Sequence, residues 1–206
     1  QKTTILILAL PISPVMDHFD LALKLLAAGR LDEARIYLEE LLALDPDNPD
    51  LLYNLGLCYV DLGQLDQGIE LLSHCLELAP RHSHACVALA VAYQKKGDLA
   101  QAREHIIHAL AIDPKNPVAL KNMGAILGRE GDSLRALYFL RQSYQADPKD
   151  PQTVYGLAFA YMEMGDIEPA QRHFQMVLDM PASEELRALA RNGLREIAVR
   201  ELKARG

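Results

Sequence analysis

Residues 54–59 read Asn54-Leu55-Gly56-Leu57-Cys58-Tyr59, and the residues that follow them include Gly63, Gly68 and Pro80. Outward from this stretch, the same residue types return at a fixed step of thirty-four residues. The series are the glycines Gly29, Gly63, Gly97, Gly131 and Gly165, the small residues Ala22, Gly56, Ala90, Gly124 and Ala158, the small residues Ala34, Gly68, Ala102, Ala136 and Ala170, and the prolines Pro46, Pro80, Pro114 and Pro148. Four series with one period indicate a tandem repeat.

Each repeat predicts two helices, as the second repeat shows. Asn48 is a good N-cap because its side chain can accept a hydrogen bond from an unpaired backbone N–H. The apolar spacing predicts a first helix over about 50–62, which Gly63 ends because glycine tolerates the left-handed conformation after a helix. A second helix is predicted over about 66–78, and Pro80 stops it.

The two small-residue series predict where the helices of a repeat come closest. A larger side chain at Gly56 or Gly68 would overpack the crossing by about 1–3 kcal/mol. Large residues such as Leu55 and Tyr59 fill the space beside the crossing. Because one helix pair cannot bury both of its apolar faces, neighbouring pairs are expected to stack into a solenoid.

The pattern Leu55-Gly56-x-x-Tyr59, with its Gly, small residue and Pro at this period, resembles the tetratricopeptide repeat. The resemblance covers about residues 15–181 and implies an all-α fold, an α-solenoid of five helix-turn-helix repeats. The expected repeats are residues 15–48, 49–82, 83–116, 117–150 and 151–182. The chain departs from the family pattern in lacking its early Trp, and Pro181 arrives one residue early in the last repeat.

Residues 183–206 predict a C-terminal capping helix with one apolar stripe. The stripe consists of Leu186, Leu189, Ala190, Leu194 and Ile197. A solenoid needs a last element that is apolar inside and polar outside. Arg187, Arg191 and Arg195 lie on the other side of this helix, and the alternative is that they bind nucleic acid or acidic lipid.

Residues 1–14 resemble the end of a preceding repeat, since Pro11 and Pro14 have the spacing of Pro46 and Pro49. They are therefore expected to be a remnant of a preceding repeat helix. The alternative is a flexible tail or an extended segment, because the run from Thr3 to Ile7 favours a strand.

Composition and charge exclude several classes of protein. The 206 residues include 50% hydrophobic residues, and the net charge of -7 argues against a nucleic-acid partner, which would require a basic face. No apolar run reaches the roughly twenty residues that span a bilayer, so no membrane association is expected. Three cysteines without paired spacing indicate buried thiols in a reducing compartment, and the predicted location is cytoplasmic.

No catalytic constellation is present, and the chain is predicted not to be an enzyme and to need no cofactor. The one cluster that suggests a metal comprises His74, Cys75, His82, His84 and Cys86. The thiols fall at core positions of the repeat and the imidazoles in or near the inter-repeat turn. A zinc site needs ligands that converge, so buried thiols beside solvated histidines are favoured over a metal.

The family resemblance implies that the first helices of the repeats line a concave groove. The predicted groove residues are Phe19, Leu23, Tyr53, Asn54, Leu57, Val87, Val91, Lys95, Lys121, Asn122, Arg129, Tyr155 and Phe159. Val60 and Met162 are expected on the same face. Each apolar side chain contributes about 1.5–3 kcal/mol when it is buried, and an exposed patch of this kind marks an interaction site. The alternative is that several of them only pack against neighbouring first helices.

The sequence therefore predicts a non-enzymatic scaffold that binds an apolar peptide or helix of a partner protein. Asn54 and Asn122 stand where similar repeats pair with a ligand backbone, and Lys95, Lys121 and Arg129 are expected to anchor an acidic end. Two alternatives remain. The chain can be the recruiting region of a larger enzyme, such as a glycosyltransferase, or a homo-oligomer that assembles through the apolar run from Ile5 to Leu10.

Overall fold

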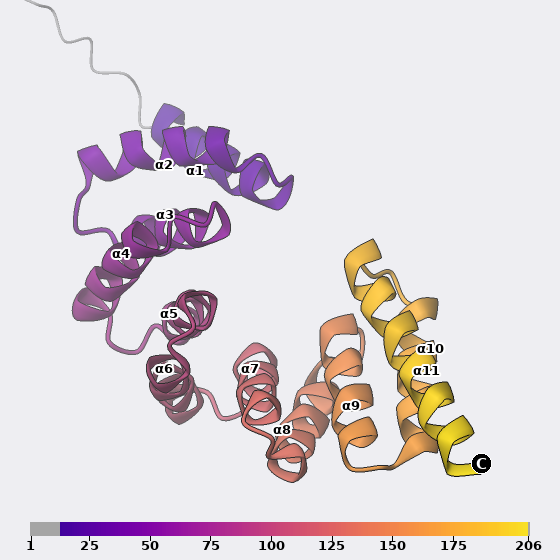
Figure 1. Cartoon of the computed structure of the whole chain (residues 1–206). Coiled ribbons are helices and arrows are strands. Elements are labelled where there is room, and N and C mark those ends of the chain that lie inside the picture. Colours follow the sequence, from indigo (N-terminus) through magenta and orange to yellow (C-terminus); the bar gives the residue numbers. More distant parts are fainter. Residues whose placement is uncertain (1–12, 206) are drawn as a thin grey trace, which may run out of the picture. The chain divides into compact units, whose positions relative to one another are not determined.

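The computed structural model describes the backbone of residues 13–205 and the side chains of residues 18–203. Helices and short connections make up the whole described range (Figure 1). The helices are α1 (Ser13–Ala27), α2 (Leu31–Leu44), α3 (Pro49–Asp61), α4 (Leu65–Leu78), α5 (Ser83–Lys96), α6 (Leu99–Ile112), α7 (Pro117–Arg129), α8 (Ser133–Ala146), α9 (Pro151–Glu163), α10 (Ile167–Asp179) and α11 (Glu184–Arg205). The bounds of α3 and α4 lie within one residue of those predicted from the sequence.

The helices group into two units, one ending at Gly97 and one beginning at Asp98. The first unit contains α1 to α5 and the second contains α6 to α11. Within each unit, helices that follow one another in the chain pack side by side. The prediction of an all-α fold built from tandem helix pairs is confirmed. The division falls inside the predicted third repeat, and the exact repeat boundaries stay a prediction.

Helices α3, α7 and α9 begin with Asn or Asp caps, of which Asn48 was predicted from the sequence. The side chain of Asn48 accepts hydrogen bonds from the two backbone N–H groups that follow Pro49, and Asn116 and Asp150 repeat this arrangement. In the third repeat, His82 takes the same role, and its Nδ1 accepts a hydrogen bond from the backbone N–H of Ala85 at 3.1 Å. These caps fix where the first helices start.

The repeated glycines have the two roles that the spacing predicts. Gly63, at the end of α3, has a φ of 79°, and the four glycines in the same register also have positive φ. At the crossing of α3 and α4, a Cβ on Gly68 would lie 2.6 Å from Cγ2 of Val60 and 2.9 Å from the backbone oxygen of Gly56. Only a residue without a side chain allows the two helices to approach this closely.

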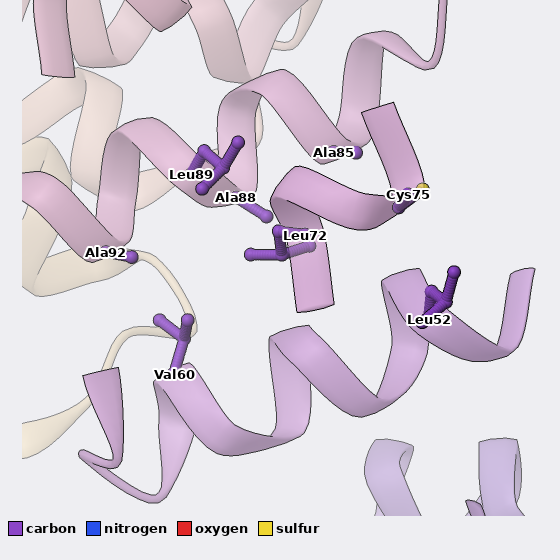
Figure 2. Packing of buried hydrophobic residues seen from close by; sticks show 8 residues of the cluster. All are labelled: Leu52, Val60, Leu72, Cys75, Ala85, Ala88, Leu89 and Ala92. Atoms are coloured by element: carbon purple, nitrogen blue, oxygen red, sulfur yellow. The ribbon is translucent and has the colours of Figure 1, made fainter. Parts of the chain in front are cut away.

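One core cluster of the first unit is made by α3, α4 and α5 (Figure 2). Its buried residues are Leu52, Val60, Leu72, Cys75, Ala85, Ala88, Leu89 and Ala92. Cys75 is fully buried, and its Sγ donates a hydrogen bond to the backbone oxygen of Pro49 at 3.3 Å. Packing of this kind between neighbouring repeats is what a solenoid requires.

In the second unit, α11 packs on α10 and α9 as a final helix. Ala190 and Ile197 are fully buried beside Phe174, and a Cβ on Gly193 would collide with the ring of Phe174. Leu189 was predicted to belong to the buried apolar stripe, and this was wrong, because its side chain is 43% exposed. The buried face of α11 is therefore centred on Gly193, which lets the helix lie directly on Phe174.

The arginines of α11 contact residues of the chain itself. Arg187 donates a hydrogen bond to the backbone oxygen of Met180 at 3.0 Å, and Arg191 forms an ion pair with Glu184. The alternative in which the arginines bind nucleic acid or lipid stays untested.

The N-terminal predictions fall largely outside the described residues. Helix α1 begins at Ser13, and residues 1–12, which include the apolar run from Ile5 to Leu10, are not described. Within residues 13–205, no helix combines the length and the apolar character that crossing a bilayer requires.

Candidate functional site

The second unit contains a groove of about 480 Å³ between α7 and α9, with α8 at its floor. We call it the α7–α9 groove. It brings together the predicted site residues of this unit, which are Lys121, Asn122, Arg129, Tyr155 and Phe159. They come from two first helices of successive repeats, as the family resemblance implies.

Three glycines give the groove its shape. A Cβ on Gly124 would lie 2.5 Å from Cγ of Leu140, and a Cβ on Gly156 would lie 2.9 Å from Cδ2 of the same leucine. These two positions therefore lie against α8. Gly128 differs, because a Cβ there would meet no atom within 4 Å. The open part of the groove lies beside Gly128.

The repeat register explains this opening. The residues at the position of Gly128 in the other repeats are Leu26, Val60, Gln94 and Met162. Val60 and Met162, which were predicted to face the groove, are instead buried in the cores of their units. The prediction was wrong because this position faces the second helix of the same repeat. Gly128 therefore marks a position where a core side chain is missing. The register contained this signal, a glycine where other repeats have Leu, Val or Met, but it was not recognised from the sequence.

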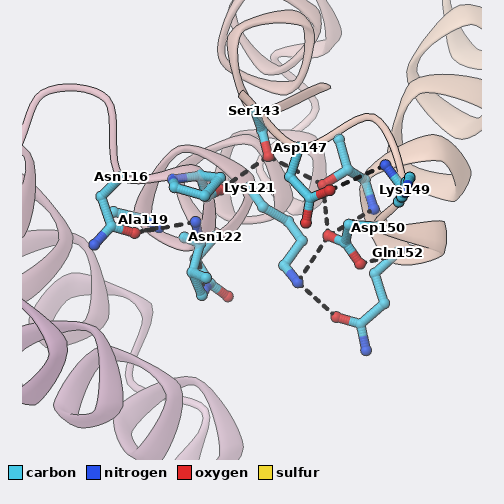
Figure 3. Close-up of polar contacts among 12 residues, drawn as sticks. Asn116, Ala119, Lys121, Asn122, Ser143, Asp147, Lys149, Asp150 and Gln152 are labelled. Carbon is cyan, nitrogen blue, oxygen red and sulfur yellow. Dashed lines mark hydrogen bonds and ion pairs between the residues drawn. The ribbon is translucent and has the colours of Figure 1, made fainter. Parts of the chain in front are cut away.

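Lys121 crosses the groove wall to the start of α9 (Figure 3). Its Nζ lies 3.0 Å from a carboxylate oxygen of Asp150 and donates a hydrogen bond to Oε1 of Gln152 at 2.9 Å. Burial alone would raise the pKa of the Asp150 carboxyl, but hydrogen bonds from Thr153 and Lys121 outweigh it and hold that pKa below its usual value. The charge of Lys121 is therefore already balanced by Asp150.

Arg129 is the cation of the groove that remains available. It is exposed at the last residue of α7 and forms no ion pair with any described residue. The residues that line the groove include no carboxylate. Asn122 donates a hydrogen bond from Nδ2 to the backbone oxygen of Val118 at 2.9 Å, while its amide oxygen has no partner among the described residues. The groove thus carries positive charge on a chain whose net charge is -7.

The α9 wall of the groove is aromatic. Tyr155 is half-buried, its ring centroid lies 5.7 Å from that of Phe174, and burial raises its pKa. Phe159 lies one turn further along and is 37% exposed. An apolar wall beside a cationic end suits a ligand that has both apolar and acidic groups.

The predicted residues of the first unit are more covered. Tyr53, Leu57 and Val91 are half-buried and pack against the core cluster of Figure 2. Val87 is only 6% exposed, so it presents almost no surface to a ligand. Here the alternative interpretation, packing against neighbouring helices, accounts for part of the predicted face.

Phe19 and Leu23 of α1 are also half-buried. Phe19 lines a hollow of about 310 Å³ together with Asp20, Asp45 and Asp50. This hollow carries carboxylates, unlike the α7–α9 groove, so the two sites attract ligands of opposite charge.

Two polar predicted residues of the first unit, Lys95 and Asn54, donate hydrogen bonds to backbone oxygens of the chain. Lys95 donates a hydrogen bond from Nζ to the backbone oxygen of Val60 at 2.9 Å, and lies 3.6 Å from a carboxylate oxygen of Asp61. Asn54 donates from Nδ2 to the backbone oxygen of Asp50 at 2.7 Å. A ligand would have to compete with these contacts.

The histidines and cysteines of the cluster lie in different environments. Cys75 and Cys86 are fully buried, and burial raises the pKa of Cys75 to about 11. His84 is exposed, and the ring of His82 stacks near Tyr53 with centroids 4.8 Å apart. Among the described residues, no three potential ligands of this kind come together.

Comparison with known proteins gives matches to a family and to solved structures. Residues 25–74, 63–126 and 129–205 match the profile of the tetratricopeptide repeat. A thermophilic TPR protein from Thermus thermophilus has a TM-score of 0.75 and 23% identity, over 87% of this chain and 98% of its own. MamA from Desulfovibrio magneticus has a TM-score of 0.65 and 20% identity, over 81% and 94%.

The Cut9–Hcn1 hetero-tetramer of the APC/C has a chain with a TM-score of 0.84 and 15% identity. The match covers 91% of this chain and 37% of that one. At these identities the solved structures support the fold alone. No curated protein matches the sequence.

Proposed function

The chain belongs to the tetratricopeptide repeat family, and from this premise we propose that it is a non-enzymatic scaffold whose α7–α9 groove holds an apolar segment of a partner protein. Repeats of this family serve generally in protein interaction. The observation that supports the groove as the site is the open space beside Gly128, where nothing outside the local turn of α7 lies within 4 Å of the position that a Cβ would take.

A partner side chain in this space would replace the one that the repeat lacks. Val60 and Met162, at the same register position, are almost completely buried. Burying one comparable side chain of the partner contributes about 1.5–3 kcal/mol. Tyr155 and Phe159 extend the apolar contact along α9.

Charge selects among apolar segments. Arg129 lies at one end of the groove without an ion-pair partner among the described residues, so a carboxylate of the partner is favoured there. The amide oxygen of Asn122 can accept a hydrogen bond from the partner backbone. The preferred segment therefore combines large apolar side chains with an acidic residue.

The proposal is tested by selecting ligands from a random peptide library on the full chain and measuring their Kd by isothermal titration calorimetry. Gly128→Leu restores the residue type of Leu26 at this position, so it should fold while filling the open space. We expect this variant to raise the Kd of the selected peptides at least tenfold, which corresponds to about 1.4 kcal/mol of binding free energy.

A matched pair of charge reversals provides the control. Arg129→Glu should weaken the binding of acidic peptides, whereas Arg81→Glu, at an exposed position of the first unit, should leave their Kd unchanged. Selected peptides that bind Gly128→Leu as tightly as the wild type would show that the groove is not the site.

A further inference from the structure

Helix α8 carries an unusual row of exposed residues on the side away from the core. Leu134, Tyr138, Arg141 and Gln145 are all exposed and have the spacing i, i+4, i+7 and i+11. This spacing places them in one line along the helix, about 16 Å long. Leu134 is 69% exposed and Tyr138 is 62% exposed. We call this row the α8 exposed face.

The matching positions of the other repeats have a different chemistry. They are occupied by Asp32, Ile36, Glu39 and Ala43 in α2, Asp66, Glu70, Ser73 and Glu77 in α4, Ala100, Glu104, Ile107 and Ala111 in α6, and Glu168, Arg172, Gln175 and Asp179 in α10. Each of these helices has at least one carboxylate in the row. The α8 exposed face has none, and it places large apolar residues where the second repeat has two acids.

The charge of this face is positive. Helix α8 contains no Asp or Glu, and Arg135 is paired with Asp132 at its N-cap. Arg141 forms no ion pair with any described residue. A cationic and apolar row on a chain with a net charge of -7 is a local reversal of the surface character.

The surface beside this row is hollowed. A hollow of about 380 Å³ is lined by Leu134, Leu137, Tyr138 and Arg141, among others. A second hollow of about 260 Å³ adjoins it through Gln142 and Gln145, and includes Lys115. The two hollows follow α8 from its apolar first half to its cationic second half.

We propose that the α8 exposed face binds an amphipathic helix of a partner protein, one that carries apolar residues and carboxylates on the same side. A straight row with this spacing, flanked by shallow hollows, is the surface against which a second helix packs its own ridge. The carboxylates of the partner helix pair with Arg141 and Lys115, and its apolar residues cover Leu134 and Tyr138. This site is separate from the α7–α9 groove.

The same charges argue against a second copy of the chain as the occupant. Two α8 exposed faces brought together would oppose Arg141 with cations and would supply no carboxylate from either helix. Like charges placed opposite each other disfavour such an interface. An acidic partner satisfies both the apolar and the cationic half of the row.

The test uses a synthetic peptide of about twenty residues, long enough to form a helix, with Leu at i, i+4, i+7 and i+11 and Glu beside them. A second peptide has Lys in place of each Glu. Fluorescence anisotropy with the full chain should show the Glu peptide binding about tenfold more tightly at low salt, a preference that shrinks as salt is added.

The deciding variant is Leu134→Asp with Tyr138→Glu, which gives α8 the residues that α4 has at these positions. It should fold, as circular dichroism would verify, and bind the Glu peptide at least about tenfold more weakly. Gly128→Leu, in the groove, should bind it as the wild type does.

Several outcomes would overturn the proposal. Equal affinity for the Lys peptide, unchanged binding by the double variant, or lost binding by Gly128→Leu would each remove the α8 exposed face as the peptide site. Two further results would also overturn the proposal if the Glu peptide did not bind. Co-sedimentation with phosphatidylserine vesicles that the double variant abolished would assign the face to a lipid surface. Dimerisation in analytical ultracentrifugation that the double variant abolished would assign it to a second copy of the chain.

Discussion

Glycines 68 and 128 both lie inside helices, yet their surroundings are opposite. A Cβ on Gly68 would collide with Val60 and the backbone of Gly56, whereas a Cβ on Gly128 would enter open space. Gly68→Ala should therefore destabilise the protein by about 1–3 kcal/mol. Gly128→Ala should stabilise it by up to about 1 kcal/mol, because alanine loses less backbone entropy in a helix. Urea denaturation of both variants measures the two effects.

This pair of variants also tests whether the space beside Gly128 is open in solution. If Gly128→Ala destabilised the protein as Gly68→Ala does, the space beside Gly128 would have to be filled in solution. The α7–α9 groove would then lose the open space that supports it as a binding site.

At the scale of elements, the start of α9 is stabilised by its cap and the start of α10 is not. Asp150 accepts hydrogen bonds from the backbone N–H groups of Gln152 and Thr153, while Asp166 makes no such bond. Asp150→Ala should cost about 1–2 kcal/mol at neutral pH, and Asp166→Ala much less. Thermal melting of the two variants compares them directly.

The same cap has a defined pH dependence. The pKa of Asp150 is lowered in the folded state, so its charge stabilises the fold above the unfolded pKa of about 3.9 and this contribution is lost as pH falls through the folded pKa. The stability difference between wild type and Asp150→Ala should therefore narrow below about pH 4. A difference that widened on acidification would contradict the assigned ion pair with Lys121.

Helix α11 separates two residues that the sequence placed on one stripe. Ile197 is fully buried, whereas Leu189 is 43% exposed. Ile197→Ala should destabilise the second unit by about 2–5 kcal/mol, because it leaves a cavity beside Phe174. Leu189→Ala should change stability by less than about 0.5 kcal/mol. Equal effects in chemical denaturation would mean that α11 packs in another rotation.

At the scale of the whole molecule, the three cysteines report on one unit only. Cys58, Cys75 and Cys86 all precede Gly97 and are buried, and burial raises the pKa of each thiol. They should react with a thiol reagent only when the first unit opens. Gly68→Ala should raise the labelling rate roughly 5- to 150-fold, as expected for about 1–3 kcal/mol.

Ile197→Ala serves as the control, because its packing partners all lie in the second unit. It should leave the labelling rate of the three thiols unchanged even though it destabilises the chain. Labelling that accelerated equally in both variants would show that the units open together.

The register of the repeats predicted most of the fold and several of the residues that line the candidate groove. Gly63, Gly68 and Asn48 have the conformations that their residue types require, because a positive φ, a close crossing and a cap are local demands. Val60 was misplaced, since a register position alone does not say which of two neighbouring helices a side chain meets. Leu189 was misplaced because the apolar stripe predicted from helical spacing is wider than the part of α11 that packs against Phe174.

The sequence by itself determined the period, the helix ends and the family, because these depend on residues close together in the chain and repeated five times. Only the tertiary structure decided which apolar residues remain available: Val87 is covered, Phe159 and Tyr138 are exposed, and the space at Gly128 is open. The physical reason is that exposure depends on which helices pack around a residue, and this packing involves residues distant in the chain that the local pattern does not specify.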